Sequence, residues 1–158
     1  MNRKILFALS LVIVAVMAMG AVSAGGVGGM FDFGSLFGGG EPQDVTLDGI
    51  TFHIPDGYEE NSALHDDGNL TDYTYFTSTS YERGYTNGDS YINVRVVEYD
   101  GTDVGEELAN YMDGTSKTVN GVSGYQYYDG IAYTFTYSMG QKVITIQSDN
   151  EELIGDVM

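Results

Sequence analysis

Residues 45–54 read VTLDGITFHI, which places the dipeptide Asp48-Gly49 between two short runs of apolar and polar residues. An Asp-Gly pair in this setting favours a two-residue β-hairpin turn, because both central positions of that turn need positive φ angles. Pro55-Asp56-Gly57 then ends the second run. The stretch predicts a β-hairpin at the start of a folded region built from antiparallel strands.

Further runs of this kind follow along the chain. We expect strands over residues 71–81, 91–99, 117–119, 124–128, 131–137 and 142–148. The separators between them are Glu82-Arg83-Gly84 with Asn87-Gly88-Asp89, then Asn120-Gly121, Asp129-Gly130 and Met139-Gly140-Gln141. Short strands joined by turn dipeptides predict an antiparallel meander sheet of six to eight strands.

Two helices are expected beside the sheet. Residues 103–113 carry apolar side chains at helical spacing after an Asp103-x-x-Glu106 capping pattern, and Gly114 ends the run. A C-terminal helix is expected with Asp149 as its N-cap and Glu152 at N3, and with Leu153, Ile154 and Val157 on its apolar side. The predicted fold class is therefore α+β, with the interior and C-terminal helices packed on a face of the sheet.

The N-terminus is typical of an export signal. Three residues, Asn2-Arg3-Lys4, precede an uncharged apolar stretch at 5–22, and Val22 and Ala24 suit the −3 and −1 positions of a signal-peptidase site. We expect cleavage after Ala24, so that residues 1–24 are a signal peptide. The alternative is that residues 5–22 remain as a membrane anchor, since their length is near the lower limit for spanning a bilayer. The predicted location is extracellular or at the cell surface, with membrane contact only through this segment.

A glycine-rich linker at 25–44 is predicted to connect that segment to a single domain at 45–158. Eight of the sixteen residues from Gly25 to Gly40 are glycine, so ordering the stretch costs more backbone entropy than its few apolar side chains return.

Charge and cysteine content exclude several classes of function. The 158 residues include 23 Asp and Glu against 6 Lys and Arg, for a formal net charge of -17. Such a surface repels phosphate backbones and anionic lipid headgroups, so no nucleic-acid partner is expected. The chain has no Cys, which excludes disulfides, zinc-thiolate sites, iron–sulfur clusters and thiol catalysis.

An acidic segment just before residue 71 is the candidate for ion binding and modification. It offers His65 together with Asp66, Asp67, Asn69 and Asp72, whose oxygens could gather around calcium. Their spacing is not that of an EF-hand, and a solvated turn is the favoured interpretation. Asn69-Leu70-Thr71 is also the chain's Asn-x-Ser/Thr sequon, so Asn69 is a candidate glycosylation site. We expect no other cofactor.

No catalytic residue is predicted. His53 and His65 are the two histidines; His53 lies in a strand with no acid at ligand spacing in the sequence. A Gly-x-Ser-x-Gly elbow and a phosphate-binding loop are absent from the sequence. A non-enzymatic role is therefore expected.

Tyrosines at alternate positions are the remaining feature that could recognise a partner. Three sets share a strand face: Tyr133, Phe135 and Tyr137; Tyr73, Tyr75 and Tyr81; and Tyr125 with Tyr127. Aromatics at period two commonly form half-buried cross-strand pairs. An exposed row would instead suit stacking on a glycan or docking a protein.

Residues 52–60, FHIPDGYEE, and 144–154, ITIQSDNEELI, resemble small exported proteins of unknown function from methanogenic archaea. The layout of residues 45–158 is also distantly similar to PsbP-like domains, in which an Ile-Pro-x-Gly strand end precedes a sheet backed by helices. The resemblance implies a non-enzymatic cell-surface or extracellular module for binding or envelope structure, and it assigns no site residue. The alternatives are a calcium-stabilised adhesion module and, less favoured, an envelope hydrolase.

Overall fold

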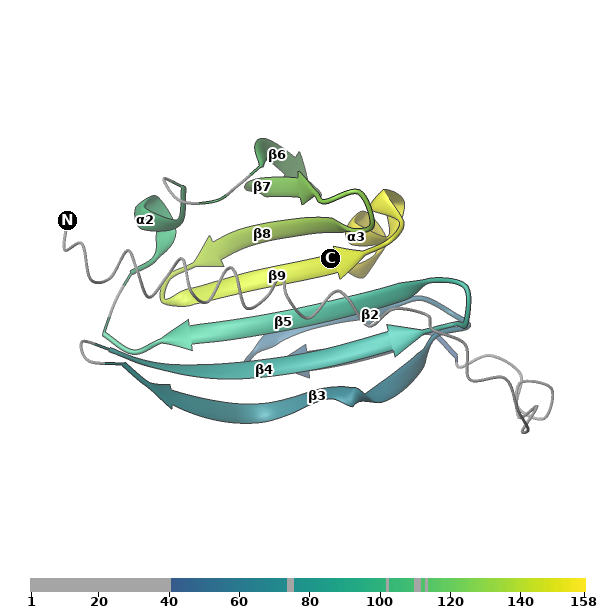
Figure 1. Ribbon diagram of the computed structural model, residues 1–158, viewed down its shortest axis with the longest axis horizontal. Coiled ribbons are helices and arrows are strands. Elements are labelled where there is room, and N and C mark those ends of the chain that lie inside the picture. Colours follow the sequence, from purple (N-terminus) through teal and green to yellow (C-terminus); the bar gives the residue numbers. More distant parts are fainter. Residues whose placement is uncertain (1–40, 74–75, 102, 110–111, 113) are drawn as a thin grey trace. The chain divides into compact units, whose positions relative to one another are not determined.

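A computed structural model describes residues 41–73, 76–101, 103–109, 112 and 114–158. The predicted signal segment, and the predicted linker up to residue 40, lie outside the described residues. The described part contains nine strands and two helices (Figure 1).

The predicted hairpin is present at the start of the described chain. Strands β1 (Gln43–Leu47) and β2 (Ile50–Ile54) pair as a separate two-stranded sheet. At the turn, φ is +46° at Asp48 and +77° at Gly49. These are the positive angles that a two-residue hairpin turn needs, so the Asp-Gly prediction is confirmed.

The main sheet has seven antiparallel strands in the order β3-β4-β5-β9-β8-β7-β6. Their bounds are β3 (Glu59–Asp72), β4 (Thr77–Thr86), β5 (Tyr91–Tyr99), β6 (Thr115–Val119), β7 (Val122–Tyr128), β8 (Tyr133–Met139) and β9 (Lys142–Ser148). Two meanders, β3 to β5 and β6 to β9, meet where β5 pairs with β9, with Val94 opposite Ile146. The last strand of the chain therefore lies in the middle of the sheet.

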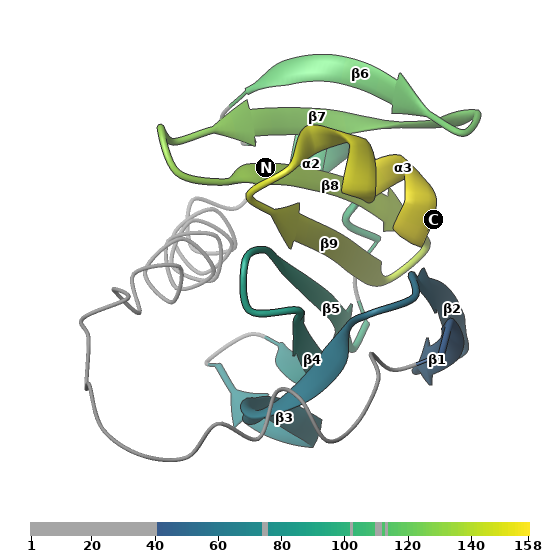
Figure 2. The same cartoon turned by 90° about the vertical axis from the view of Figure 1, so that its right-hand side faces the viewer.

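One face of this sheet carries the main hydrophobic core. The core contains Ile92, Val94 and Val96 of β5, Ile144 and Ile146 of β9, and Phe135 of β8. Side chains from the β1–β2 hairpin, including Phe52 and Ile54, complete the same cluster. So do Ile154 and Val157 of helix α3 (Glu151–Val157), which lies on the hairpin's side of the sheet (Figures 1 and 2).

The C-terminal helix was predicted correctly except for its cap. Asn150, not Asp149, occupies the N-cap position, and its Oδ1 accepts a hydrogen bond from Glu152 N at 3.1 Å. Asp149 Oδ1 instead accepts hydrogen bonds from Tyr91 N at 3.2 Å and from Ser90 Oγ. Asp149 therefore joins the start of β5 to the end of β9.

The interior helix is shorter than the α+β prediction required. Helix α2 spans Gly105–Ala109, and residues 110, 111 and 113 of the predicted run lie outside the described residues. Five residues make little more than one turn, and a glycine at the start of the helix weakens it. The described chain is therefore mostly β, with one substantial helix at the C-terminus.

The two helices also lie on opposite faces, although they were expected on one. Val104 and Leu108 are buried outside the main core, and a Cβ at Gly105 would lie 3.6 Å from Ser138 Oγ. Ser138 pairs with Val143, at the alternate positions whose side chains point away from the main core. Helix α2 thus packs at one end of the second face.

Strand β3 corrects the interpretation of the acidic segment as a solvated turn. It is an edge strand exposed along most of its length, so it lacks the apolar alternation that identifies half-buried strands. The run 71–81, predicted as one strand, contains the end of β3 at Asp72 and the start of β4 at Thr77, and Tyr73 N donates to Phe76 O at 2.9 Å between them. Glu82-Arg83-Gly84, predicted as loop, belongs to β4.

Candidate functional site

Strand β3 is longer than its partner and bulges against it. It has 14 residues against 10 in β4, and the four additional ones fall at two register shifts. Asn61 pairs with Gly84 and His65 with Arg83, so residues 62–64 have no partner positions on β4. A second shift between Asp67 and Asn69 leaves out Gly68. Bulges interrupt the ladder of backbone hydrogen bonds and re-aim the side chains beside them.

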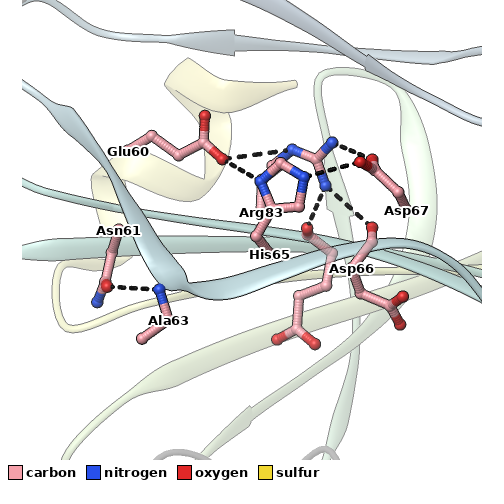
Figure 3. A network of polar contacts seen from close by, with 8 residues as sticks. Glu60, Asn61, Ala63, His65, Asp66, Asp67 and Arg83 are labelled. Carbon is pink, nitrogen blue, oxygen red and sulfur yellow. Dashed lines mark hydrogen bonds and ion pairs between the residues drawn. The ribbon is translucent and has the colours of Figure 1, made fainter.

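Four side chains meet at the bulged segment, and we call them the His65 cluster: Glu60, His65, Asp67 and Arg83 (Figure 3). The His65 ring lies between two carboxylates, with Nδ1 2.6 Å from Glu60 Oε1 and Nε2 2.8 Å from Asp67 Oδ2. A neutral imidazole carries one N–H, whereas both of these contacts use a donor nitrogen. The geometry therefore fits the doubly protonated imidazolium form.

Arg83 connects the cluster to the backbone of both strands. Its guanidinium pairs with Asp67 Oδ1, and its Nε lies 3.5 Å from Glu60 Oε1. Its Nη1 donates to the carbonyl oxygen of Asp66 at 2.9 Å and to that of Glu82 at 2.8 Å. Only 14% of the Arg83 side chain is exposed, so the group that joins these oxygens is largely shielded from water.

These contacts shift the acid–base behaviour of the cluster. Hydrogen bonds to Asp67 first and Glu60 second raise the pKa of His65 above its ordinary value of 6.5. Hydrogen bonds from Arg83 first and His65 second lower the pKa of Asp67. Each partner favours the charged form of the other.

The cluster is poorly arranged for catalysis or metal binding. Both ring nitrogens of His65 face carboxylates, so neither offers a lone pair to a substrate or an ion. Because the ring separates Glu60 from Asp67, the three groups do not converge on one point. Within the described ranges, no group of three His, Asp or Glu side chains is placed to hold a metal ion.

The residues predicted as calcium ligands are also dispersed. Asp66 and Asp67 point to opposite faces of β3, since successive strand residues alternate. Asp66 Oδ2 accepts from Ser80 Oγ at 2.6 Å, and its Oδ1 accepts from Asn69 N at 3.1 Å. Asp72 pairs with Thr77 at the far end of the strand.

We therefore expect calcium to leave the stability of the protein unchanged. The thermal midpoint should be the same in chelator and in millimolar calcium at fixed ionic strength, because an ion raises the midpoint only if it binds the folded state. Magnesium at equal ionic strength is the control for screening. A rise specific to calcium, lost in Asp67→Asn, would contradict this expectation and restore the calcium-stabilised module.

The glycosylation candidate is accessible. Asn69 is exposed on the edge strand, opposite Ser80, and its side chain makes no hydrogen bond among those found for the described residues. Occupancy of this sequon stays a prediction.

The partner of His53 could not be identified from the sequence. His53 Nδ1 lies 2.6 Å from Asp44 Oδ1, because the register of the hairpin sets Asp44 opposite His53. Both side chains are more than half exposed. This pair is an exposed contact between one histidine and one carboxylate, whereas His65 contacts two carboxylates.

The second face of the main sheet is rich in hydroxyl and amide groups. Alternation places Ser80 and Glu82, Asn93 and Arg95, Thr145 and Gln147, Thr134 and Thr136, and Tyr125 and Tyr127 on it. Tyr133, Phe135 and Tyr137 share one face of β8, as their alternate positions predict, and this face is the core side. Tyr125 and Tyr127 thus lie on the opposite face from those three, and Tyr75 is outside the described residues.

A small pocket lies on this second face beside α2. Its volume is about 210 Å³, and the described residues that line it are uncharged. Leu108 and Ala109 form the apolar wall, and the strands contribute five hydroxyl-bearing residues, Ser116, Ser123, Tyr125, Tyr137 and Ser138. The three serines belong to no recognisable motif, so sequence reasoning did not find them.

No family model, curated protein or solved structure matches the chain in the three comparisons made. Neither of the helices in the described ranges has the length and apolar character needed to cross a membrane.

Proposed function

We propose that the chain is an exported, non-enzymatic domain of the cell surface or extracellular space that binds a partner through the second face of its main sheet. The observation that carries the proposal is the contrast between the two faces. The hairpin and α3 complete a hydrophobic core on one face, whereas the other carries mainly polar side chains. Ser80, Glu82, Thr136, Thr145 and Gln147 of that face are buried, and Tyr125 and Tyr127 are partly exposed. Export is supported by the N-terminal signal pattern.

The chemistry of the pocket favours a neutral glycan as the partner. Hydroxyl groups can donate and accept hydrogen bonds with sugar hydroxyls, while Tyr125, Leu108 and Ala109 offer apolar surface to a sugar ring. A pocket of about 210 Å³ suits one sugar unit at the end of a longer chain. The net charge of -17 works against anionic ligands.

A non-enzymatic role is supported by the chemistry of the described histidines. The ring nitrogens of His65 are both engaged, and His53 forms an exposed surface pair with Asp44. Neither stands beside a hydroxyl nucleophile in the hydrogen bonds of the described residues, which is the arrangement that a serine hydrolase needs.

Neutral oligosaccharides should bind the purified chain, and Tyr125→Ala should weaken that binding roughly tenfold by removing an aromatic contact. Saturation-transfer NMR with a panel of neutral cell-wall oligosaccharides would detect even weak binding, and a titration of any ligand found would give Kd.

The matched control is Tyr128→Ala, which removes a tyrosine from the same strand but from the other face. It should leave Kd unchanged. Binding by no saccharide of the panel, or equal loss in the two variants, would contradict a glycan site on the second face.

A further inference from the structure

We propose that the His65 cluster is a proton-dependent lock on the edge of the main sheet, holding the bulged part of β3 against β4 when His65 is charged and releasing it when His65 is neutral. This regulatory role goes beyond the proposed binding function and does not depend on it.

The bulged segment needs side chains to hold it because its backbone does not pair continuously. Residues 62–64 and Gly68 fall at the two register shifts, so ladder hydrogen bonds are interrupted on both sides of His65. Arg83 Nη1 supplies a substitute by donating to the carbonyl oxygen of Asp66. Without the cluster, a short central piece of β3 would be attached through few backbone bonds.

The charges in the cluster balance only when His65 is protonated. Glu60 and Asp67 then face two cations, His65 and Arg83. Loss of the proton leaves two carboxylates and one cation, and it turns one imidazole nitrogen into an acceptor facing a carboxylate oxygen. One of the two His65 contacts must then break.

Two tyrosines of β4 pair with the carboxylates of the cluster, Tyr81 with Asp67 and Tyr85 with Glu60. Burial first and the Glu60 charge second raise the pKa of Tyr85 to about 12. The pKa of Asp67 is lowered, so this carboxyl remains charged at neutral pH. His65 is therefore the member of the cluster whose change of charge we use as the switch.

The direction of the pH dependence follows from the raised pKa of His65. A group whose pKa is higher in the folded state contributes its full stabilisation below the unfolded-state value, which is 6.5 for histidine. That contribution is lost as the pH rises through the folded-state pKa. We expect β3 to be attached below pH 6.5 and to loosen locally as the pH rises through the raised pKa of His65.

Release should be local, because the cluster lies at the surface and exposed ion pairs contribute little to global stability. It would also free the Leu64 side chain, which lies over Gly84 of β4; a Cβ at Gly84 would stand only 2.6 Å from Leu64 Cδ1. Residues 62–68 are thus the segment whose motion should report the change.

NMR of the full chain, with ¹⁵N labelling of the backbone and ¹³C labelling of histidine, tests the proposal. The ring signals of His65 and the amide shifts of residues 62–68 should share one midpoint above pH 6.5, and the heteronuclear NOE of those amides should fall above it. His65→Gln should remove the transition and give the mobile values at every pH. His53→Gln, which removes the histidine of the exposed β1–β2 pair, should leave the transition intact.

Asp67→Asn provides a second variant should His65→Gln fail to fold. It removes the largest cause of the raised pKa and should move the shared midpoint to lower pH. The proposal is overturned if the amides of residues 62–68 do not follow His65, if they titrate unchanged in His65→Gln, or if Asp67→Asn leaves the midpoint in place. None of these readouts involves a glycan, so they are separate from the test of the proposed function.

Discussion

Phe135→Ala is expected to lower the free energy of unfolding by about 3–5 kcal/mol, the range for deleting a fully buried aromatic side chain. Phe135 has no exposed surface and belongs to the main core cluster, where its ring lies 5.8 Å from that of Tyr137. Truncation removes apolar surface from the core and leaves a cavity on the core face of the sheet. Urea unfolding followed by far-ultraviolet circular dichroism measures the change.

The control is Ile131→Ala, which truncates an apolar residue in the loop just before β8. Ile131 is 65% exposed, so its loss should change the free energy of unfolding by no more than about 0.5 kcal/mol. A Phe135→Ala protein as stable as Ile131→Ala would mean that β8 does not contribute its Phe135 to the core.

Local patterns were sufficient for elements whose signal lies within a few residues. The turn at Asp48-Gly49 was predictable because few residues other than glycine tolerate positive φ. The bounds of β5 and β9 were predicted as residues 91–99 and 142–148, and the structure has the same bounds. Both are central strands, and burial imposes clear limits on where their apolar residues begin and end.

Pairing between distant strands was not predictable in the same way. The contact of β5 with β9 joins residues about fifty positions apart, and no local pattern specifies which central strands become neighbours. Strand β3 was missed for the opposite reason, since an exposed edge strand is under little pressure to be apolar. Of the interior helix predicted over residues 103–113, the described residues show Gly105–Ala109 as helix.

The same contrast between local patterns and long-range pairing applies to the candidate sites. The composition of the sequence identifies the acidic segment around His65. The directions in which its carboxylates point follow only once the segment is known to be a strand, because successive strand residues point to opposite faces. The sequence predicts a loop at Arg83, so the position of Arg83 opposite His65 could not be anticipated. The pocket serines come from three strands whose adjacency only the folded sheet creates.

Gly124→Ala is expected to destabilise the protein by about 1–3 kcal/mol, the usual cost of overpacking. A Cβ at this position in β7 would lie 2.5 Å from the Thr136 carbonyl oxygen and 2.7 Å from Phe135 Cζ. The oxygen belongs to the backbone of β8 and cannot turn aside, so the two strands must separate. The same urea unfolding measurement gives the change.

Two further variants distinguish this cause from a general preference for glycine. Gly155→Ala in α3 places its Cβ no closer than 3.8 Å to Val119, so it should stabilise the protein by about 0.5–1 kcal/mol as a helical glycine replaced by alanine. Phe135→Leu should not rescue Gly124→Ala, since the Thr136 carbonyl oxygen remains in place. Full rescue by Phe135→Leu would show instead that the aromatic ring, and not the close approach of the two backbones, requires glycine at this position. Because Gly124 also lines the pocket on the second face, the spacing of β7 and β8 that it permits is part of the geometry on which the proposed glycan site depends.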